Sequence, residues 1–180
     1  MKNFYYGSQT INNQDIKVVS QTLKSRLITQ GPNLVKFENN LSKYFGSKYC
    51  LTVSSGTAAL HLSVLSLNAK KNDIIITTPI TFLASAACIA YSNCKIVLVD
   101  INLSNFTIDV EKLEKKLIEL KKNKKKIKAL IAVDYGGYPC NWKKLKNLSQ
   151  KFNFFLINDN CHALGSKYFN SKQYAQKYAE

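Results

Sequence analysis

An acidic residue and a histidine stand three positions apart near the end of the chain, in the segment Ile157-Asn158-Asp159-Asn160-Cys161-His162. Asp159 follows an apolar run, where a carboxylate is costly to desolvate unless it has a partner. A protonated pyridine nitrogen would be such a partner, because holding that proton makes the ring an electron sink. His162 could reach the same cavity and donate to a ring oxygen. The alternative is that Asp159 caps the following turn and His162 is a structural histidine.

Small residues dominate a second segment, Ser54-Ser55-Gly56-Thr57-Ala58-Ala59-Leu60. It is predicted to be a turn that enters a helix, and the unpaired N–H groups of a helix N-terminus hold phosphate well. Gly56 permits close backbone approach, while the hydroxyls of Ser55 and Thr57 add donors. The segment therefore suits a phosphate, with an ordinary helix N-cap as the alternative.

An aromatic residue, Phe82, follows another predicted strand within Thr78-Pro79-Ile80-Thr81-Phe82. In that place it could stack on a planar ligand ring, although core packing is the commoner role for a single phenylalanine. A third interpretation treats Ser55, His162 and Asp159 as a hydrolase constellation. It is disfavoured because the serine lacks a G-x-S-x-G elbow and because the other two residues lie within one turn.

The elements that must position these residues follow from hydrophobic spacing. Apolar residues at three- and four-residue intervals predict helices, and short apolar runs predict buried strands. The predicted helices span residues 15–25, 32–45, 57–67, 84–91, 110–120 and 142–152. The predicted strands span residues 49–53, 74–77, 95–99, 129–133 and 154–157. Strands that alternate with helices predict a three-layer α/β/α fold with a mainly parallel sheet, whose ligands bind beyond the carboxyl ends of the strands.

Composition narrows the function classes. The 180 residues carry a formal charge of +15, but Arg26 is the only arginine, whereas base and phosphate recognition favours arginine, so we expect no nucleic-acid partner. The densest basic run, 121–126, is predicted to be a solvated connection. Five cysteines without metal-like spacing predict mostly buried, reduced thiols and no metal site. Neither a membrane span nor a signal peptide is evident, so we expect a cytoplasmic protein.

Taken together, the motifs resemble the DegT/StrS-type sugar aminotransferases, a branch of the fold-type-I pyridoxal-phosphate enzymes. The resemblance covers nearly the whole chain, and its specificity comes from five motifs in register. These are the Ser54–Leu60, Thr77–Phe82 and Asp159–Gly165 segments described above, the Leu27–Pro32 segment with Phe37-Glu38, and Val99-Asp100-Ile101. The opening Phe4–Gln9 and the Thr-Thr-Pro-Ile-Thr-Phe segment look like the pseudaminic acid branch of that family.

The resemblance implies a role for each motif. Ser55, Gly56 and Thr57 would bind the phosphate of pyridoxal 5'-phosphate, and Phe82 would stack on its ring. Asp159 would pair with the pyridine nitrogen, and His162 would contact the ring hydroxyl. Further residues would line the site of a UDP-linked 4-keto-6-deoxy sugar, which receives an amino group from an amino-acid donor, glutamate. These substrate residues are Tyr6, Arg26, Leu27, Ile28 and Thr29.

One departure from the family pattern limits what this chain would do alone. The family's cofactor-holding lysine lies in a Ser-Phe-His-x-x-Lys segment, which is absent from the 180 residues. We therefore expect an N-terminal segment over 1–33 and a partial cofactor-binding large domain over 34–180, with the C-terminal small domain missing. The complete protein would form a homodimer, and this chain would be inactive alone. The alternatives are a non-catalytic remnant or binding protein of the same fold, and a sugar dehydratase with histidine in place of that lysine.

Overall fold

The computed structural model describes residues 7–167. The chain divides into two compact units, Met1–Leu51 and Thr52–Glu180. In this division the helix after residue 32 belongs with the helix that precedes it, so the break comes later than the domain boundary predicted at residues 33 and 34. That boundary stays a prediction about the domains of the complete protein.

From residue 7 onwards, the first unit contains two helices whose ends are set by local sequence. Helix α1 spans Asn13–Leu23 and begins with a capping box, in which Asn12 Oδ1 accepts from Gln14 N at 2.8 Å and Asp15 Oδ2 accepts from Asn12 N at 2.9 Å. Helix α2 spans Pro32–Phe45. Proline suits its first turn, and Gly46 ends it in the left-handed conformation at φ 69°. Both predicted helices are confirmed.

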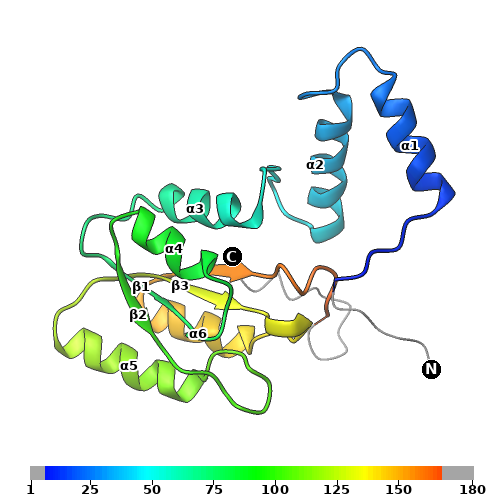
Figure 1. The fold of residues 1–180 in the computed structure, drawn as a ribbon. Coiled ribbons are helices and arrows are strands. Elements are labelled where there is room, and N and C mark those ends of the chain that lie inside the picture. Colours follow the sequence, from blue (N-terminus) through cyan, green and yellow to red (C-terminus); the bar gives the residue numbers. More distant parts are fainter. Residues whose placement is uncertain (1–6, 168–180) are drawn as a thin grey trace. The chain divides into compact units, whose positions relative to one another are not determined.

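Up to residue 167, the second unit is a four-stranded parallel sheet with helices on both faces (Figure 1). Its strands are β1 (Ile74–Thr77), β2 (Lys95–Leu98), β3 (Ile127–Val133) and β4 (Phe155–Asp159), in the order β2-β1-β3-β4. Its helices are α3 (Gly56–Ser66), α4 (Ala84–Tyr91), α5 (Val110–Lys122) and α6 (Trp142–Phe152). Helices α3 and α4 cover one face, and α5 and α6 cover the other, which confirms the predicted three-layer fold.

Two apolar clusters hold the layers together. Successive side chains of a strand point to opposite faces, so Ile75 packs with the α3 and α4 side while Ile76 packs with the α5 and α6 side. Because both faces are covered, β1 reads as a continuous apolar run in the sequence. The α5 and α6 side includes the fully buried Trp142. This packing fixes the carboxyl ends of β1, β3 and β4 at one edge of the sheet.

One predicted strand is wrong. Residues 49–53 have no regular secondary structure, and Tyr49 and Leu51 are 76% and 83% exposed. An apolar run becomes a buried strand only where neighbouring strands accept its backbone hydrogen bonds. The described sheet ends at β2 and β4, and neither pairs with this segment. Strand β4 pairs only with β3 among residues 7–167, which leaves Phe155 half-exposed.

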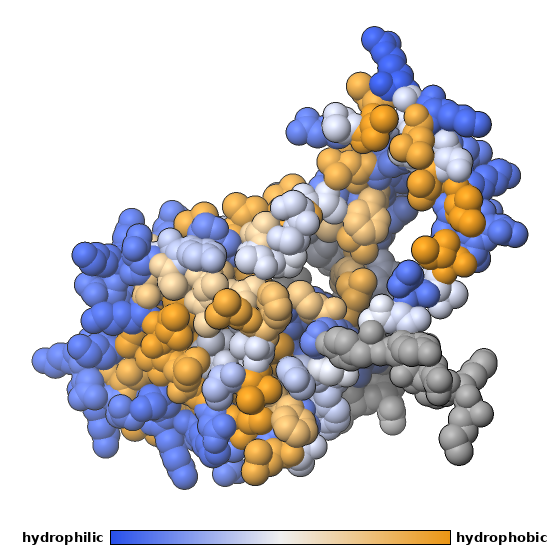
Figure 2. Space-filling model, in the orientation of Figure 1, coloured by the Kyte–Doolittle hydropathy of each residue, from blue (hydrophilic) through white to orange (hydrophobic). Residues whose placement is uncertain are grey.

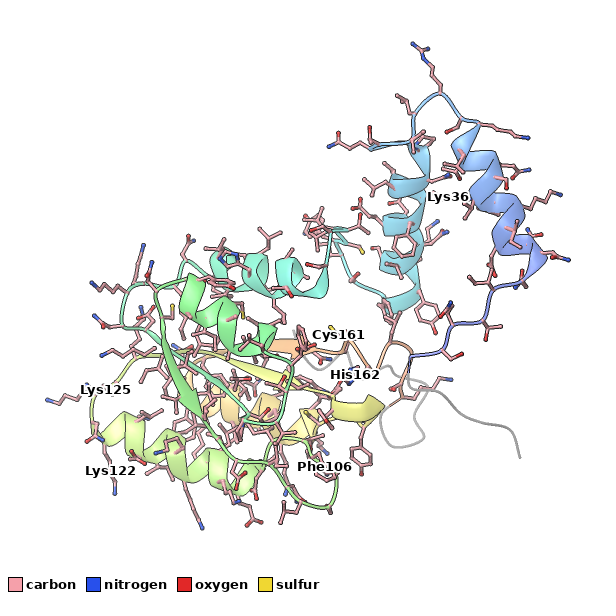
Figure 3. The ribbon with its side chains drawn as sticks, in the orientation of Figure 1. Lys36, Phe106, Lys122, Lys125, Cys161 and His162 are labelled. Atoms are coloured by element: carbon pink, nitrogen blue, oxygen red, sulfur yellow. The ribbon has the colours of Figure 1, made fainter. Side chains whose placement is uncertain are left out.

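The lysine run over 121–126 is fully exposed, as predicted, but Lys121 and Lys122 still belong to α5, so the connection to β3 begins only at Asn123. Figure 2 shows hydrophilic surface at the left of the view, where Figure 3 labels Lys122 and Lys125. Over residues 7–167, none of the helices has the length and apolarity to span a bilayer.

Candidate functional site

The candidate site lies beyond the carboxyl ends of β1 and β4, which are separated in the sheet by β3. Asp159 is the last residue of β4 and is only 6% exposed. Its Oδ2 accepts a hydrogen bond from Ser85 Oγ at 2.8 Å, and its Oδ1 accepts a long one from the backbone N–H of Cys161 at 3.4 Å. Oδ2 therefore accepts a short hydrogen bond and Oδ1 a long one, and the Cys161 thiol also hydrogen-bonds to this carboxylate.

Ser85 is a site residue that the sequence interpretation missed. It lies in the first turn of α4, is fully buried, and has its Oγ 2.8 Å from Thr81 Oγ1. A signal for it does exist in the sequence. A serine inside the otherwise apolar helix Ala84–Tyr91 must bury its hydroxyl, and a buried hydroxyl needs a hydrogen-bond partner.

The predicted phosphate turn forms the start of α3. Ser55 is the N-cap, and its Oγ accepts from Ala58 N at 3.1 Å, so the N-cap interpretation is correct for this side chain. Helix geometry leaves the first-turn N–H groups of Gly56 and Thr57 without acceptors inside the helix. No acidic residue stands in that turn. Its N–H groups and partial positive charge remain suited to an anion.

Gly56 connects the phosphate turn to the Asp159 turn. A Cβ built at Gly56 would lie 3.2 Å from Cys161 Sγ, closer than most real Cβ contacts. Cys161 follows Asp159 by two residues and donates its backbone N–H to that carboxylate. The α3 N-terminus and Asp159 thus belong to the same small region of the second unit. This juxtaposition is what a ligand with a phosphate and a protonated ring would need.

In the sequence, Phe82 lies between Thr81 and Ser85, whose hydroxyl groups form the chain of hydrogen bonds to Asp159. Its side chain is 75% exposed, and its carbonyl accepts the N–H of Ser85 at 3.1 Å. An exposed aromatic ring at a sheet edge leaves a flat apolar face available for stacking. The core-packing alternative is therefore wrong for this residue.

His162 is held by the turn that follows β3. The backbone N–H of Gly136 donates to its Nδ1 at 3.3 Å, and its ring meets Tyr135 edge-on at 6.0 Å between centroids. Because Nδ1 accepts this bond, the neutral ring carries its proton on Nε2. Figure 3 labels Cys161 and His162 in the turn after β4. The free Nε2–H can donate to an oxygen of a bound ring.

The turn that holds His162 is built on a buried acid. Asp134 Oδ1 accepts from Cys140 N at 2.8 Å and from Trp142 Nε1 at 3.0 Å, while its backbone N–H donates to Asp159 O at 3.0 Å. Burial raises the pKa of Asp134 above its ordinary value, against the lowering effect of its hydrogen bonds to Cys140 and Trp142. Asp134 was not predicted as a functional residue, and its contacts make it a support for the 135–137 turn.

The thiols near Asp159 are neutral at physiological pH. Burial, followed by the hydrogen bond and negative charge of Asp159, raises the pKa of Cys161 to about 11. Burial is also the main cause that raises the pKa of Cys88 to about 11.

All five cysteines are free, as expected, but the prediction of mostly buried thiols was wrong. Only Cys88 and Cys140 are buried, and Cys161 is exposed.

The hydrolase interpretation finds no support in the recorded contacts. Ser55 Oγ accepts from a backbone N–H, and His162 Nδ1 accepts from Gly136. Asp159 is bonded to Ser85 and Cys161 instead of to the histidine. The three residues thus make separate contacts and form no proton relay within the described part of the chain.

Not every predicted site residue is placed by the structure. Tyr6 lies outside the described residues. Arg26, Leu27, Ile28 and Thr29 are exposed residues of the first unit, and their role at a sugar site stays a prediction. Among residues 7–167, no three His, Cys, Asp or Glu side chains are placed to hold a metal ion.

A separate cavity of about 530 Å³ opens beside the N-termini of α5 and α6. Its walls include Asn105, Asp109, Tyr138 and Lys144. None of the predicted cofactor residues lines it. Its acidic and basic side chains offset each other, so it offers no selective attraction for an anion.

Comparison with known proteins identifies the class to which this fold and site belong. Residues 9–177 match the DegT/DnrJ/EryC1/StrS aminotransferase family. Since this match covers most of the 180 residues, the chain belongs to that family.

Particular relatives refine the assignment. The chain is 37% identical over 167 residues to the UDP-4-amino-4,6-dideoxy-N-acetyl-beta-L-altrosamine transaminase of Campylobacter jejuni, covering 93% of this chain and 43% of the relative. Helicobacter pylori PseC, an aminotransferase of pseudaminic acid biosynthesis, superposes with a TM-score of 0.83 at 32% identity, over 95% of this chain and 45% of PseC. The chain therefore spans less than half the length of these relatives.

A dehydratase of the same fold is also similar. The Escherichia coli GDP-4-keto-6-deoxy-D-mannose-3-dehydratase, solved with bound hydrated pyridoxal phosphate, gives a TM-score of 0.85 at 26% identity, over 95% of this chain and 44% of the enzyme. Structural neighbours of this chain thus bind pyridoxal phosphate. The similarity covers both transaminases and a dehydratase.

Proposed function

We propose that this chain is the cofactor-binding part of a pyridoxal-phosphate-dependent aminotransferase that acts on a UDP-linked 4-keto-6-deoxy sugar in pseudaminic acid biosynthesis. The amino donor in this proposal is glutamate. The observation that carries the proposal is the closeness of the α3 N-terminus to the Asp159 turn, through the 3.2 Å approach of a Gly56 Cβ to Cys161 Sγ. One small phosphorylated ring could contact both.

The residues present fit pyridoxal phosphate. The first-turn N–H groups of Gly56 and Thr57, with the proton of the Ser55 hydroxyl, would bind the phosphate. Asp159 would accept the pyridinium N–H, and Phe82 would stack on the ring. When bound, the cofactor supplies an electron sink for moving an amino group.

His162 would complete the cofactor contacts. Its Nε2–H is directed to donate, because Gly136 occupies Nδ1. A donor at the ring hydroxyl oxygen would stabilise negative charge on that oxygen. The chain's own residues therefore bind and orient the cofactor, and hold a proton at its ring nitrogen.

The sugar substrate is proposed from the relatives. The transaminase of Campylobacter jejuni is named for a UDP-linked amino sugar, and the match covers 93% of this chain. Tyr6 and the 26–29 segment would line the sugar site. We further propose that the complete protein is a cytoplasmic homodimer. Size-exclusion chromatography with light scattering would test the dimer by measuring its molar mass.

Two other functions remain alternatives. The similarity to a GDP-sugar 3-dehydratase favours a dehydratase relative as the second candidate. A non-catalytic binding protein of the same fold is the third. The three differ in what the complete protein does to a keto sugar.

The decisive experiment supplies the complete protein with pyridoxal phosphate, glutamate and a UDP-4-keto-6-deoxy sugar. Transamination yields a 4-amino sugar together with 2-oxoglutarate, both detectable by mass spectrometry. Loss of the 3-hydroxyl from a keto sugar would indicate the dehydratase. Sugar returned unchanged, from protein shown by absorbance to hold cofactor, would contradict both enzymatic proposals.

A further inference from the structure

Two hydroxyl groups stand in line behind the Asp159 carboxylate. Ser85 Oγ lies 2.8 Å from Asp159 Oδ2, and Thr81 Oγ1 lies 2.8 Å from Ser85 Oγ. Asp159 is nearly buried and Ser85 is fully buried. These contacts join a strand end to a helix start 74 residues earlier in the chain.

The direction of these hydrogen bonds follows from counting protons. An ionised carboxylate has no proton to give, so Ser85 donates to Asp159. A hydroxyl has one proton, so Ser85 cannot also donate to Thr81, and Thr81 must donate to Ser85. Both protons therefore point towards the carboxylate.

Ser85 differs from Ser63 within α3 and from Ser92, the residue that caps the end of α4. Ser92 and Ser63 each donate to the carbonyl four residues earlier, Cys88 O and Ala59 O, at 2.9 and 2.8 Å. That local bond is the usual choice for a serine inside a helix. The Ser85 hydroxyl is instead directed across the fold to Asp159, which points to a role beyond helix stability.

The bonding leaves the two carboxylate oxygens unequal. Oδ2 is held by Ser85 at 2.8 Å, which limits rotation of the carboxylate about its Cβ–Cγ bond, whereas the backbone donor at Oδ1, Cys161 N, lies 3.4 Å away. Thr81 and Ser85 also flank Phe82 in sequence. The same contacts thus connect the proposed stacking ring to the proposed proton-holding carboxylate.

We propose that Thr81 and Ser85 form a two-hydroxyl relay that positions Asp159, so that Oδ1 faces the pyridine nitrogen of a bound pyridoxal cofactor. This inference rests on the proposed function and assigns it two positioning residues. Neither hydroxyl needs to touch the cofactor. Their effect would pass through the orientation of the carboxylate.

The test uses pyridoxamine 5'-phosphate, which binds without a covalent lysine, and follows it by fluorescence titration. We expect Ser85→Ala to weaken binding by roughly 10-fold, the usual effect of losing a hydrogen bond to a charged group. Ser85→Thr keeps the hydroxyl and should restore most of the affinity. Thr81→Val, which keeps the side-chain shape, should give a smaller loss of about 2- to 5-fold.

Two measurements separate positioning from general destabilisation. The pH at which the bound pyridine nitrogen loses its proton, read from the cofactor's absorbance, should fall in Ser85→Ala, because a misplaced carboxylate stabilises the pyridinium less. Ser92→Ala removes a hydroxyl at the other end of the same helix and should leave both readouts unchanged. Circular dichroism identifies any variant that fails to fold, and Thr81→Val then decides in place of Ser85→Ala.

The outcomes are distinct. Weaker binding with a lower titration pH in Ser85→Ala, restored by Ser85→Thr, supports the relay. Unchanged binding and titration in folded Ser85→Ala would overturn the relay while the proposed function stands. These measurements use the complete protein. If its folded wild type does not bind pyridoxamine 5'-phosphate, the proposed function fails, and the relay fails with it.

Discussion

The backbone N–H of Gly136 donates to Nδ1 of His162 over 3.3 Å, which joins the turn after β3 to the turn after β4. The two strands are neighbours in the sheet, with Val133 paired to Asp159. A backbone donor cannot change its role with pH or rotate away. It therefore determines which nitrogen of the histidine is left to act on a ligand.

This contact predicts the tautomer of His162. Nitrogen-15 NMR of the neutral imidazole should show that His162 carries its proton on Nε2 and none on Nδ1. The sequence has only one other histidine, His61, so the His61→Gln variant leaves His162 as the single source of imidazole signals. A proton on Nδ1 would contradict the hydrogen bond from Gly136.

Substitution tests the same residue as a donor. Glutamine can place its amide nitrogen near the position of Nε2, whereas the shorter asparagine reaches only as far as Nδ1. His162→Gln should therefore keep affinity for pyridoxamine 5'-phosphate within about 3-fold, and His162→Asn should lose about 10-fold. Equal losses in the two variants would mean that the Nε2–H makes no contact with the ligand.

Phe82 provides a prediction with a matched control, because its neighbour Leu83 is almost equally exposed, at 74% against 75%. Phe82→Ala should weaken binding of pyridoxamine 5'-phosphate by about 5- to 20-fold through the loss of ring stacking. Leu83→Ala should have no effect on binding. Since both side chains are exposed, each change should alter the free energy of unfolding by less than about 0.5 kcal/mol. Similar losses of binding in both variants would argue against stacking.

The close approach of Gly56 and Cys161 predicts a coupling between them. Gly56→Ala places a methyl group 3.2 Å from Cys161 Sγ and should lower the free energy of unfolding by about 1 kcal/mol through crowding. Cys161→Ala removes the sulfur, so the double variant should recover most of that loss. Urea unfolding of the four proteins in the cycle measures the coupling energy. Additive effects would show that the two turns do not press on each other.

Asp134 predicts a dependence of stability on pH. Its pKa is raised in the folded protein, so its ionisation disfavours folding. Its contribution to stability is fully present below the unfolded pKa, about 3.9, and is lost as pH rises through the raised folded value. Asp134→Asn, which keeps an acceptor for Cys140 N and Trp142 Nε1, should remove this loss and flatten the pH profile of urea unfolding above pH 4. A profile parallel to that of the wild type would contradict the shift.

Trp142→Phe is the structural control for that experiment. It removes the Nε1–H donor while it keeps most of the buried ring, and should cost about 1–3 kcal/mol by leaving the acid with one donor fewer. The cost should shrink in the Asp134→Asn background, where the acceptor is neutral. Equal costs in both backgrounds would mean that the charge of Asp134 does not matter to the bond.

The sequence by itself determined most of the elements, because helix and strand patterns depend on residues a few positions apart. Pro32 and Gly46 marked the ends of α2, and the apolar run over 74–77 marked β1. Alternation of these elements implied a parallel sheet, and a parallel sheet places Phe82 and Asp159 at the same edge. The family motifs, which are also local, led to the same residues.

Only the tertiary structure decided which distant groups touch. Whether 49–53 forms a strand depends on neighbours that a local pattern does not contain, and in the described chain it has none. The bond between Ser85 and Asp159 spans 74 residues, and the contact between Gly136 and His162 requires β3 and β4 to be adjacent. Strand order and helix packing set these distances, because both depend on interactions between residues that are far apart in the sequence. Candidate residues such as Phe82 and Asp159 could therefore be proposed from the sequence, whereas Ser85 and the hydrogen bonds of the site required the structure.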